Sequence, residues 1–130
     1  MITNNLKIIK LKKELLRFLF AGIVAVSIDL IIYFILLDYF SHNFSKLFSF
    51  IAGTFAAYLI NKFWTFEKRR KSYLEIIKFA LLYTLTMFCN VYINKITLDY
   101  TQFIILGFLV ATGFSSILNF LGQKFWVFKR

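Results

Sequence analysis

Four apolar stretches, each of about 20 residues, take up most of this 130-residue chain. A helix of that length spans the hydrocarbon core of a bilayer. Hydrophobic residues make up 60% of the sequence, whereas a soluble domain has about 45–50%. The sequence therefore predicts an all-α integral membrane protein without a separate soluble domain. Its expected transmembrane helices cover about residues 17–37, 47–64, 76–93 and 103–120.

The N-terminal segment 1–14 is polar and rich in lysine. We expect it to form a short cytoplasmic or interfacial helix that runs into the first span. No small-residue cleavage site follows its basic residues, so we do not expect a signal peptide that is removed. The single cysteine, Cys89, lies within a predicted span. No group of residues has metal-ligand spacing, so the sequence predicts no disulfide, metal site or cofactor.

The positive charges are distributed unevenly. Of the 16 Lys and Arg residues, 14 lie at the ends of the spans that also carry the two termini, and only Lys46 and Lys95 lie at the other ends. The positive-inside rule then predicts that both termini and the basic segment 68–71 are cytoplasmic. The net charge of +10 flanks apolar spans, so we expect anionic lipid headgroups as its partner and not nucleic acid.

A six-residue motif occurs twice. Asn61–Phe66 (NKFWTF) returns as Gln123–Phe128 (QKFWVF), 62 positions later, and each copy ends an apolar stretch and precedes basic residues. Tryptophan followed by Lys or Arg is typical of a span that leaves the bilayer on the cytoplasmic side. The repetition predicts two units, at about 15–70 and 76–130. Each unit would be a helical hairpin, and the two hairpins would be parallel, related by a twofold axis along the membrane normal.

Small or polar residues recur at every fourth position of the second span in each unit, so they share one helix face. Small side chains let two helix backbones approach closely in lipid. We therefore predict that these faces pack against the neighbouring helix of each hairpin. The residues are Ser45, Ser49, Gly53, Ala57 and Asn61 in the first unit, and Gly107, Ala111, Ser115, Asn119 and Gln123 in the second.

Asp29 is an acidic residue inside a predicted span. It lies twelve positions after Arg17, which is about 18 Å along a helix axis and places it near or a little beyond the middle of the membrane. In the repeat alignment it matches Asn90, and Tyr33 matches Asn94. Two interpretations of Asp29 stay open: a neutral carboxyl that is hydrogen-bonded to one of these asparagines, or a group on a transport path or proton relay.

These motifs resemble those of the GtrA-like family, small four-span proteins of bacterial cell-surface polysaccharide synthesis. The resemblance runs from about Leu15 to the end of the chain and rests on four segments. They are Arg17-Phe18 with Gly22, Asn61–Phe66, Lys78-Phe79, and Asn119 with Lys124–Phe128. The second copy of the motif departs from the first, because Gln123 replaces Asn61.

The resemblance implies a protein of the bacterial plasma membrane that moves a polyprenyl-phosphate-linked sugar for polysaccharide or teichoic acid glycosylation. The lipid would be a sugar-linked undecaprenyl phosphate, and a separate glycosyltransferase would be a partner. Four cations at the predicted cytoplasmic ends of the spans could hold the phosphate by charge-assisted hydrogen bonds: Arg17, Lys62, Lys78 and Lys124. The expected path of the sugar headgroup uses Asp29, Asn61, Trp64, Asn90, Asn94, Asn119, Gln123 and Trp126.

Two other functions are compatible with the sequence. The chain could be a non-catalytic membrane anchor that recruits a glycosyltransferase through its basic segments. It could also be a small multidrug-type proton antiporter, which would need a membrane acid such as Asp29. We do not expect an enzyme, because the sequence has no nucleophile–base set and no paired acids. The small number of spans suggests a homodimer.

Overall fold

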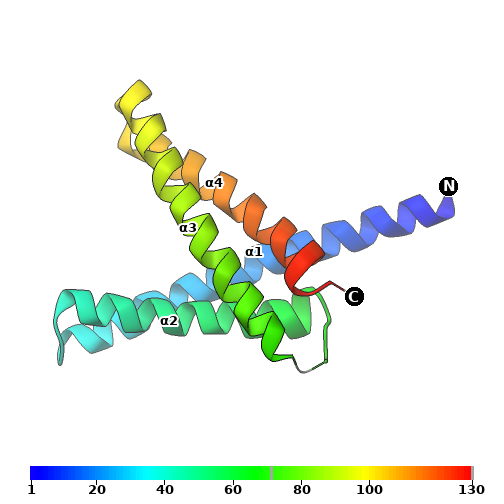
Figure 1. The fold of residues 1–130 in the computed structure, drawn as a ribbon, viewed down its shortest axis with the longest axis horizontal. Coiled ribbons are helices and arrows are strands. Elements are labelled where there is room, and N and C mark those ends of the chain that lie inside the picture. The colour runs from blue at the N-terminus through cyan, green and yellow to red at the C-terminus, as the bar shows by residue number, and fades with distance from the viewer. Residues whose placement is uncertain (71, 130) are drawn as a thin grey trace. The chain divides into compact units, whose positions relative to one another are not determined.

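The computed structural model describes residues 1–70 and 72–129 (Figure 1). Lys71 and Arg130, which belong to the predicted cytoplasmic basic clusters, lie outside the described residues. The described chain is helical, and its elements follow in the order α1 (Ile2–Leu37), α2 (His42–Ile60), η1 (Asn61–Thr65), α3 (Tyr73–Thr101), α4 (Ile104–Gly122) and η2 (Gln123–Val127). The elements η1 and η2 are short π-helices that directly continue α2 and α4.

The helices form two compact units, Met1–Arg69 and Arg70–Arg130. In the first unit α1 packs against α2 and η1, and in the second α3 packs against α4 and η2. Each unit is therefore a helical hairpin. The twofold relation between the hairpins stays a prediction.

In the first hairpin, α1 is one uninterrupted helix of 36 residues, about 54 Å long. We expected the segment 1–14 to be a short helix leading into the span, and the structure joins it to the span without a break. The connection to α2 is shorter than the predicted loop 38–46. The reason is a cap at Ser41, whose side chain accepts a hydrogen bond from the backbone N–H of Phe44, so that α2 begins at His42.

The second hairpin corrects another predicted loop. We expected residues 94–102 to be a polar loop, but they continue α3 as far as Thr101. This segment contains neither Gly nor Pro, so its polar composition alone does not end the helix. The helix ends at Gln102, which has φ 60° and donates its backbone N–H to the carbonyl of Leu98.

The faces of small residues lie inside each hairpin, which confirms that prediction. Ser45, Ser49 and Ala57 are at most 3% exposed, as are Ala111 and Gln123 in the second hairpin. The closest approach is at Gly53, where a Cβ atom would lie 2.8 Å from the carbonyl oxygen of Ala25 and 3.0 Å from Cβ of Asp29. Only glycine permits this distance between α1 and α2.

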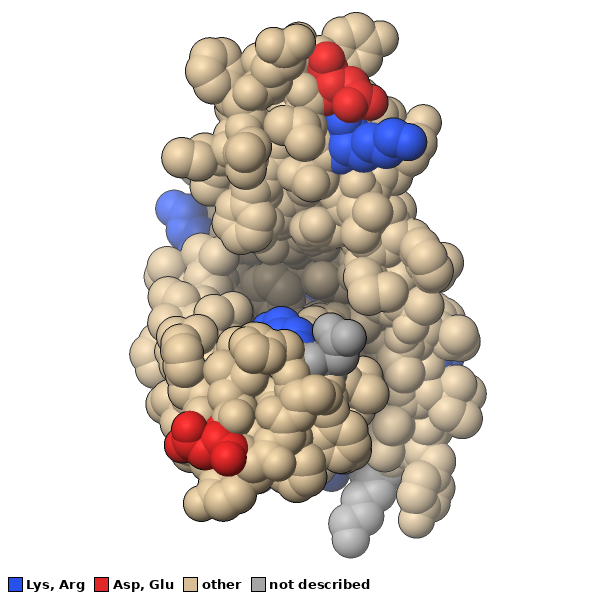
Figure 2. Space-filling model, turned by 90° about the vertical axis from the view of Figure 1, so that its left-hand side faces the viewer, with Lys and Arg blue, Asp and Glu red and all other residues tan. Residues whose placement is uncertain are grey.

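The large apolar side chains mostly point away from the hairpin interfaces. Many are more than half exposed, including Ile23 and Phe34 on α1 and Phe88 on α3. Four helices are long and apolar enough to cross a membrane, so these side chains can face lipid. Figure 2 views the structure from the side on which the α1–α2 loop lies in Figure 1, and uncharged side chains cover most of that face. The chain is a multi-pass membrane protein.

Candidate functional site

Both copies of the repeated motif form a π-helical turn. The backbone N–H of Phe66 donates to the carbonyl of Asn61, and that of Phe128 donates to the carbonyl of Gln123, both at 2.8 Å. Each bond spans five residues instead of the four of an α-helix, so each motif places one extra residue in its last turn. Single π-helical turns within α-helices are frequent at functional sites.

Each motif carries both buried and partly exposed aromatic side chains. Phe66 and Phe128 are buried, at 5% and 2% exposed, whereas Trp64 and Trp126 are 40% and 42% exposed. The two tryptophans are therefore equally available at the surface of their hairpins. In the first copy the amide side chain of Asn61 is buried, and its Oδ1 accepts a hydrogen bond from Thr65 Oγ1 at 2.9 Å. The second copy has Val127 in place of Thr65, and Gln123 in place of Asn61 is fully buried.

In the first hairpin, Arg17 of α1 lies against Trp64 of η1. The guanidinium carbon is 5.0 Å from the centre of the indole ring, a cation–π distance. The same guanidinium donates a 2.7 Å hydrogen bond from Nη1 to the backbone carbonyl of Trp64. Carbonyls in the last turn of a helix lack partners within it, and a cation there also suits the helix dipole. Arg17 therefore caps the π turn and fixes the position of its tryptophan.

The second hairpin repeats this pair. Lys78 of α3 places Nζ 5.7 Å from the ring centre of Trp126. The sequence predicted Arg17 and Lys78 as equivalent cations and Trp64 and Trp126 as equivalent aromatics. The structure brings each cation onto the tryptophan of its own hairpin, and we call these the two cation–tryptophan pairs.

The other two predicted cations lie within the π turns. Nζ of Lys62 is 5.8 Å from the ring of Tyr58 and 5.5 Å from that of Phe63, and Lys62 is only 4% exposed. Nζ of Lys124 is 5.7 Å from the ring of Phe125. The structure thus gives each hairpin two cations near one π turn. A common phosphate site made by all four stays a prediction.

Glu67 follows the first π turn and was not among the predicted site residues. Its Oε1 accepts hydrogen bonds from Lys13 Nζ at 2.7 Å and Arg17 Nη1 at 2.9 Å. Its backbone is in the left-handed region, with φ 51°, which is uncommon for a residue other than Gly and costs energy. The hydrogen bond and charge of Lys13, with a smaller effect of Arg17, hold the pKa of Glu67 below its ordinary value of 4.5. The equivalent position in the second copy is Lys129.

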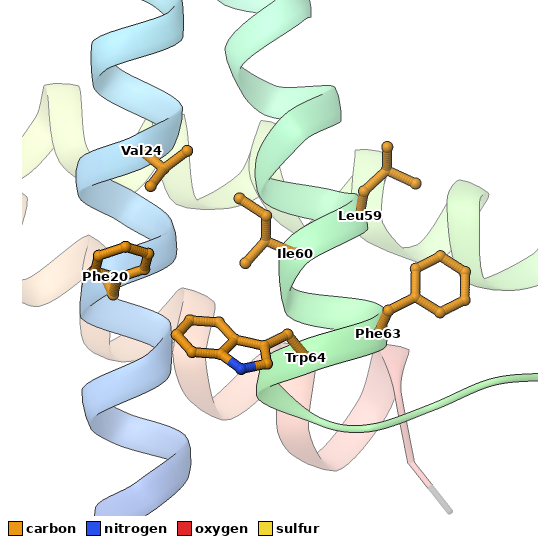
Figure 3. Close-up of a pocket in the computed structure, with 6 residues that line it drawn as sticks. All are labelled: Phe20, Val24, Leu59, Ile60, Phe63 and Trp64. Atoms are coloured by element: carbon orange, nitrogen blue, oxygen red, sulfur yellow. The ribbon is translucent and has the colours of Figure 1, made fainter.

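The first hairpin has an apolar groove between α1 and the helix formed by α2 and η1 (Figure 3). It has a volume of about 460 Å³ and is lined by Phe20 and Val24 of α1 and by Leu59, Ile60, Phe63 and Trp64 of the opposite helix. Trp64 closes the end near Arg17, and its ring meets the ring of Phe20 edge to face at 5.4 Å. We call this feature the Phe20–Trp64 groove. One tryptophan therefore contacts both the cation and the apolar surface.

Asp29 has a partner in its own hairpin. Its Oδ2 accepts a 2.8 Å hydrogen bond from Nζ of Lys46, which lies in α2 and not in the predicted loop 38–46. The carboxylate side chain is 18% exposed and the lysine side chain 58%. The other oxygen, Oδ1, is buried, and no group in residues 1–70 and 72–129 hydrogen-bonds to it. Asp29 thus belongs to an ion pair and keeps one acceptor atom for another donor.

The predicted asparagines of the second hairpin connect its two helices. Asn90 donates from Nδ2 to Ser115 Oγ at 3.0 Å, and Asn119 accepts from Thr86 Oγ1 at 2.9 Å. Asn94 lies over Gly107, where an added Cβ would be 2.9 Å from its Oδ1. The second hairpin therefore uses neutral hydrogen bonds where the first places Asp29 against Gly53.

The comparison with known families decides the identity of the fold. The family model described as GtrA/DPMS, transmembrane domain, matches residues 17–128. This range includes both π turns, both cation–tryptophan pairs and most of each of the four helices that could cross a membrane. The chain belongs to the GtrA/DPMS transmembrane-domain family. No solved structure matches it significantly.

Membership places this GtrA/DPMS protein in glycosylation-related processes that use lipid-linked sugars. Domains of this kind are generally non-catalytic membrane proteins. The predicted resemblance to the GtrA-like family is thereby confirmed over nearly the whole chain.

Two buried acidic residues of this GtrA/DPMS protein are further functional candidates that the sequence did not predict. Glu14 and Glu75 are buried, at 6% and 5% exposed, and neither is without a partner. They are equivalent at the repeat distance of 61 residues that also relates Arg17 to Lys78. Extending the repeat alignment three residues toward the N-terminus would have found them, because a repeated acid one turn before a repeated cation is unusual in a lipid-facing helix.

Proposed function

We propose that this GtrA/DPMS protein translocates a polyprenyl-phosphate-linked sugar across the bacterial plasma membrane. The sugar would then serve glycosylation of a cell-surface polysaccharide or teichoic acid. The partners in this proposal are the lipid-linked sugar, the surrounding lipids and a second copy of the chain, together with a glycosyltransferase that makes the substrate.

The observation that carries this proposal is the cation–tryptophan pair in each hairpin. A lipid-linked sugar brings a phosphate, a sugar ring and an apolar tail to one place. Arg17 and Lys78 offer charged donors for the phosphate, and the half-exposed indoles of Trp64 and Trp126 offer surfaces on which a sugar can stack. Lys62 and Lys124 add a cation to each π turn.

Polar groups farther along the hairpins support a path for the headgroup. Asp29 has an acceptor oxygen without a partner in the described chain, and Asn90 and Asn94 lie at the equivalent level of the second hairpin. A polar headgroup that crosses the membrane needs such groups, because hydroxyls without hydrogen bonds in hydrocarbon cost several kcal/mol each.

The test is transport by the purified protein in proteoliposomes that contain no other protein. A polyprenyl-phosphate-linked sugar is placed in the outer leaflet of the vesicles. Periodate is then added outside, where it oxidises only the sugar that remains in that leaflet, so the fraction of sugar that becomes protected reports translocation. We expect Arg17→Gln combined with Lys78→Gln to slow transport at least about tenfold, and Lys62→Gln combined with Lys124→Gln to do the same. The control is Lys95→Gln at the opposite end of the spans, which should transport normally.

A second candidate function is a membrane anchor for a glycosyltransferase. The length of α1 supports this candidate, because a helix of 36 residues exceeds the roughly 20 needed to span a bilayer and carries a lysine-rich N-terminal half. An anchor would show no transport in protein-only vesicles. It would instead lose its effect on the glycosyltransferase when residues 2–12 are deleted. Transport by the purified protein would exclude the anchor as the sole function.

A further inference from the structure

We infer that the Phe20–Trp64 groove and the cations at its end form a binding site for a single isoprenoid chain with a phosphate head, and that Glu67 occupies the position of that phosphate when the lipid is absent. This inference rests on the proposed function and adds a competitor built into the chain itself.

The first step concerns charge. Lys13 Nζ and Arg17 Nη1 both donate to the same oxygen of Glu67, at 2.7 and 2.9 Å. Two cations that converge on one carboxylate oxygen can equally converge on a phosphate oxygen, because both anions accept charge-assisted hydrogen bonds of the same length. The side chains of Lys13 and Glu67 are 46% and 44% exposed. An incoming anion can therefore reach the cluster without unfolding the hairpin.

The second step concerns the groove. Trp64 contacts both a cation and the groove. The centre of its ring lies 5.0 Å from the guanidinium carbon of Arg17, and the residue also lines the groove beside Phe20. The six lining residues are all apolar or aromatic, so the groove suits a hydrocarbon chain that ends in an anion at the cations. Charge at one end and apolar surface along the rest match a phosphate-headed lipid better than either free phosphate or an uncharged lipid.

The third step concerns Glu67 as a replaceable group. The residue has a left-handed backbone, which a non-glycine residue keeps only when its surroundings hold it there. Its carboxylate is bound by the two cations in this conformation. When a phosphate takes over Lys13 and Arg17, the carboxylate loses that support and is repelled by the new anion. The second copy of the motif has Lys129 at this position, so a carboxylate competitor is a property of the first hairpin.

The experiment measures lipid binding through Trp64. In a Trp126→Phe background Trp64 is the only tryptophan of the chain, and its fluorescence reports the groove and Arg17 together. The purified full-length protein in detergent is titrated with undecaprenyl phosphate, undecaprenol, inorganic phosphate and diacyl phosphatidic acid. We expect undecaprenyl phosphate to bind tightest, and Glu67→Gln to tighten its binding about tenfold by removing the competing charge. Binding of uncharged undecaprenol should not change.

Two variants serve as controls. Asp38→Asn removes an acid at the other end of α1 and changes the net charge equally, so it should leave the Kd unchanged. Val24→Phe fills the groove without adding a second tryptophan, and it should weaken undecaprenyl phosphate binding both alone and in combination with Glu67→Gln. If Glu67→Gln misfolds by circular dichroism, Glu67→Gly provides the same test, because it also removes the competing carboxylate, suits the backbone at φ 51° and should tighten binding.

Three results would overturn the inference. They are an unchanged or weaker affinity in Glu67→Gln, an equal tightening in Asp38→Asn, or binding of diacyl phosphatidic acid as tight as that of undecaprenyl phosphate. The outcome is separable from the proposed function. Transport in vesicles with no effect of Glu67→Gln on affinity would refute the competitor and keep the function, whereas a tenfold effect without transport would keep the site and refute translocation.

Discussion

Lys46 lies 2.8 Å from Asp29 within the first hairpin, so the acidic residue of the first span has its counter-ion on the neighbouring helix. The equivalent positions of the second hairpin are Asn90 and Phe108, neither of which carries a charge. Each hairpin thus avoids an uncompensated charge in hydrocarbon, the first by an ion pair and the second by neutral residues.

The ion pair predicts unequal effects of removing its two members. Lys46→Gln leaves a carboxylate that is 18% exposed without its cation, and we expect a loss of about 2–3 kcal/mol in the free energy of unfolding. Asp29→Asn leaves a lysine that is 58% exposed and can extend to the headgroups, so the expected loss is under about 1 kcal/mol. Unfolding in detergent micelles at fixed pH measures both.

The double variant Asp29→Asn with Lys46→Gln is the control for this prediction. It should recover most of the stability that Lys46→Gln loses, because no charge remains inside the hairpin. Strictly additive losses would mean that the two side chains do not interact and that the pairing is wrong.

Gly53 predicts a steric effect that another glycine of the same hairpin does not share. A Cβ at Gly53 would lie 2.8 Å from the carbonyl oxygen of Ala25, so Gly53→Ala should push α1 and α2 apart and cost about 1–3 kcal/mol. At Gly22 a Cβ would have no atom within 4 Å. Gly22→Ala should therefore be neutral or stabilising by about 0.5–1 kcal/mol. Equal effects of the two changes on the melting temperature would argue against the close approach at Gly53.

The overall fold was predictable from the sequence because two strong signals coincide. Apolar length identifies the spans, and the spacing of Ser45, Ser49 and Gly53 identifies the face that packs. The ends of the helices were less predictable. The polar segment 94–102 looks like a loop, but polar residues at the end of a helix can reach the interface or water without ending the helix.

The sequence selects candidate site residues but does not indicate which of them contact one another. Arg17 and Trp64 were each selected from composition and repetition, yet their contact depends on how α1 and η1 are aligned. The amino-acid composition does not indicate the π turn that begins at Asn61, because its hydrogen bond differs from that of an α-helix by only one position. The predicted loop 38–46 includes Lys46, whereas the structure places Lys46 in α2, where it pairs with Asp29. Glu67 directly precedes the basic segment 68–71, so the sequence does not single it out as a site residue.

The Glu67 cluster predicts a pH dependence of stability. The pKa of Glu67 is lowered in the folded protein, chiefly by Lys13, so the folded state binds this proton less readily than the unfolded state. The contribution is fully present above the ordinary pKa of 4.5 and is lost as the pH falls through the lowered folded-state value. Melting temperatures of the wild type and Glu67→Gln should differ at pH 7 and converge in acid. A difference that persists below the folded-state pKa would show that the glutamine acts by something other than charge.

The distribution of basic residues predicts the orientation of both hairpins. In the predicted four-span topology the two termini and 14 of the 16 cations lie on one side of the membrane, so that side should be cytoplasmic. Reporter fusions at the C-terminus and within segment 68–71 should then read cytoplasmic, whereas fusions at Tyr39 and Gln102, in the two short connections, should read external. The second external fusion is placed at Gln102 and not within segment 94–101, because that segment belongs to α3. A control variant replaces Arg69 and Arg70 by Gln. It should lower the fraction of molecules in which the second hairpin has the predicted orientation, and it should leave the helices unchanged. An external C-terminus beside a cytoplasmic segment 68–71 would mean that the second unit crosses the membrane an odd number of times. It would then not be a two-span hairpin parallel to the first, and the equivalence of the two cation–tryptophan pairs would hold in sequence but not in the membrane.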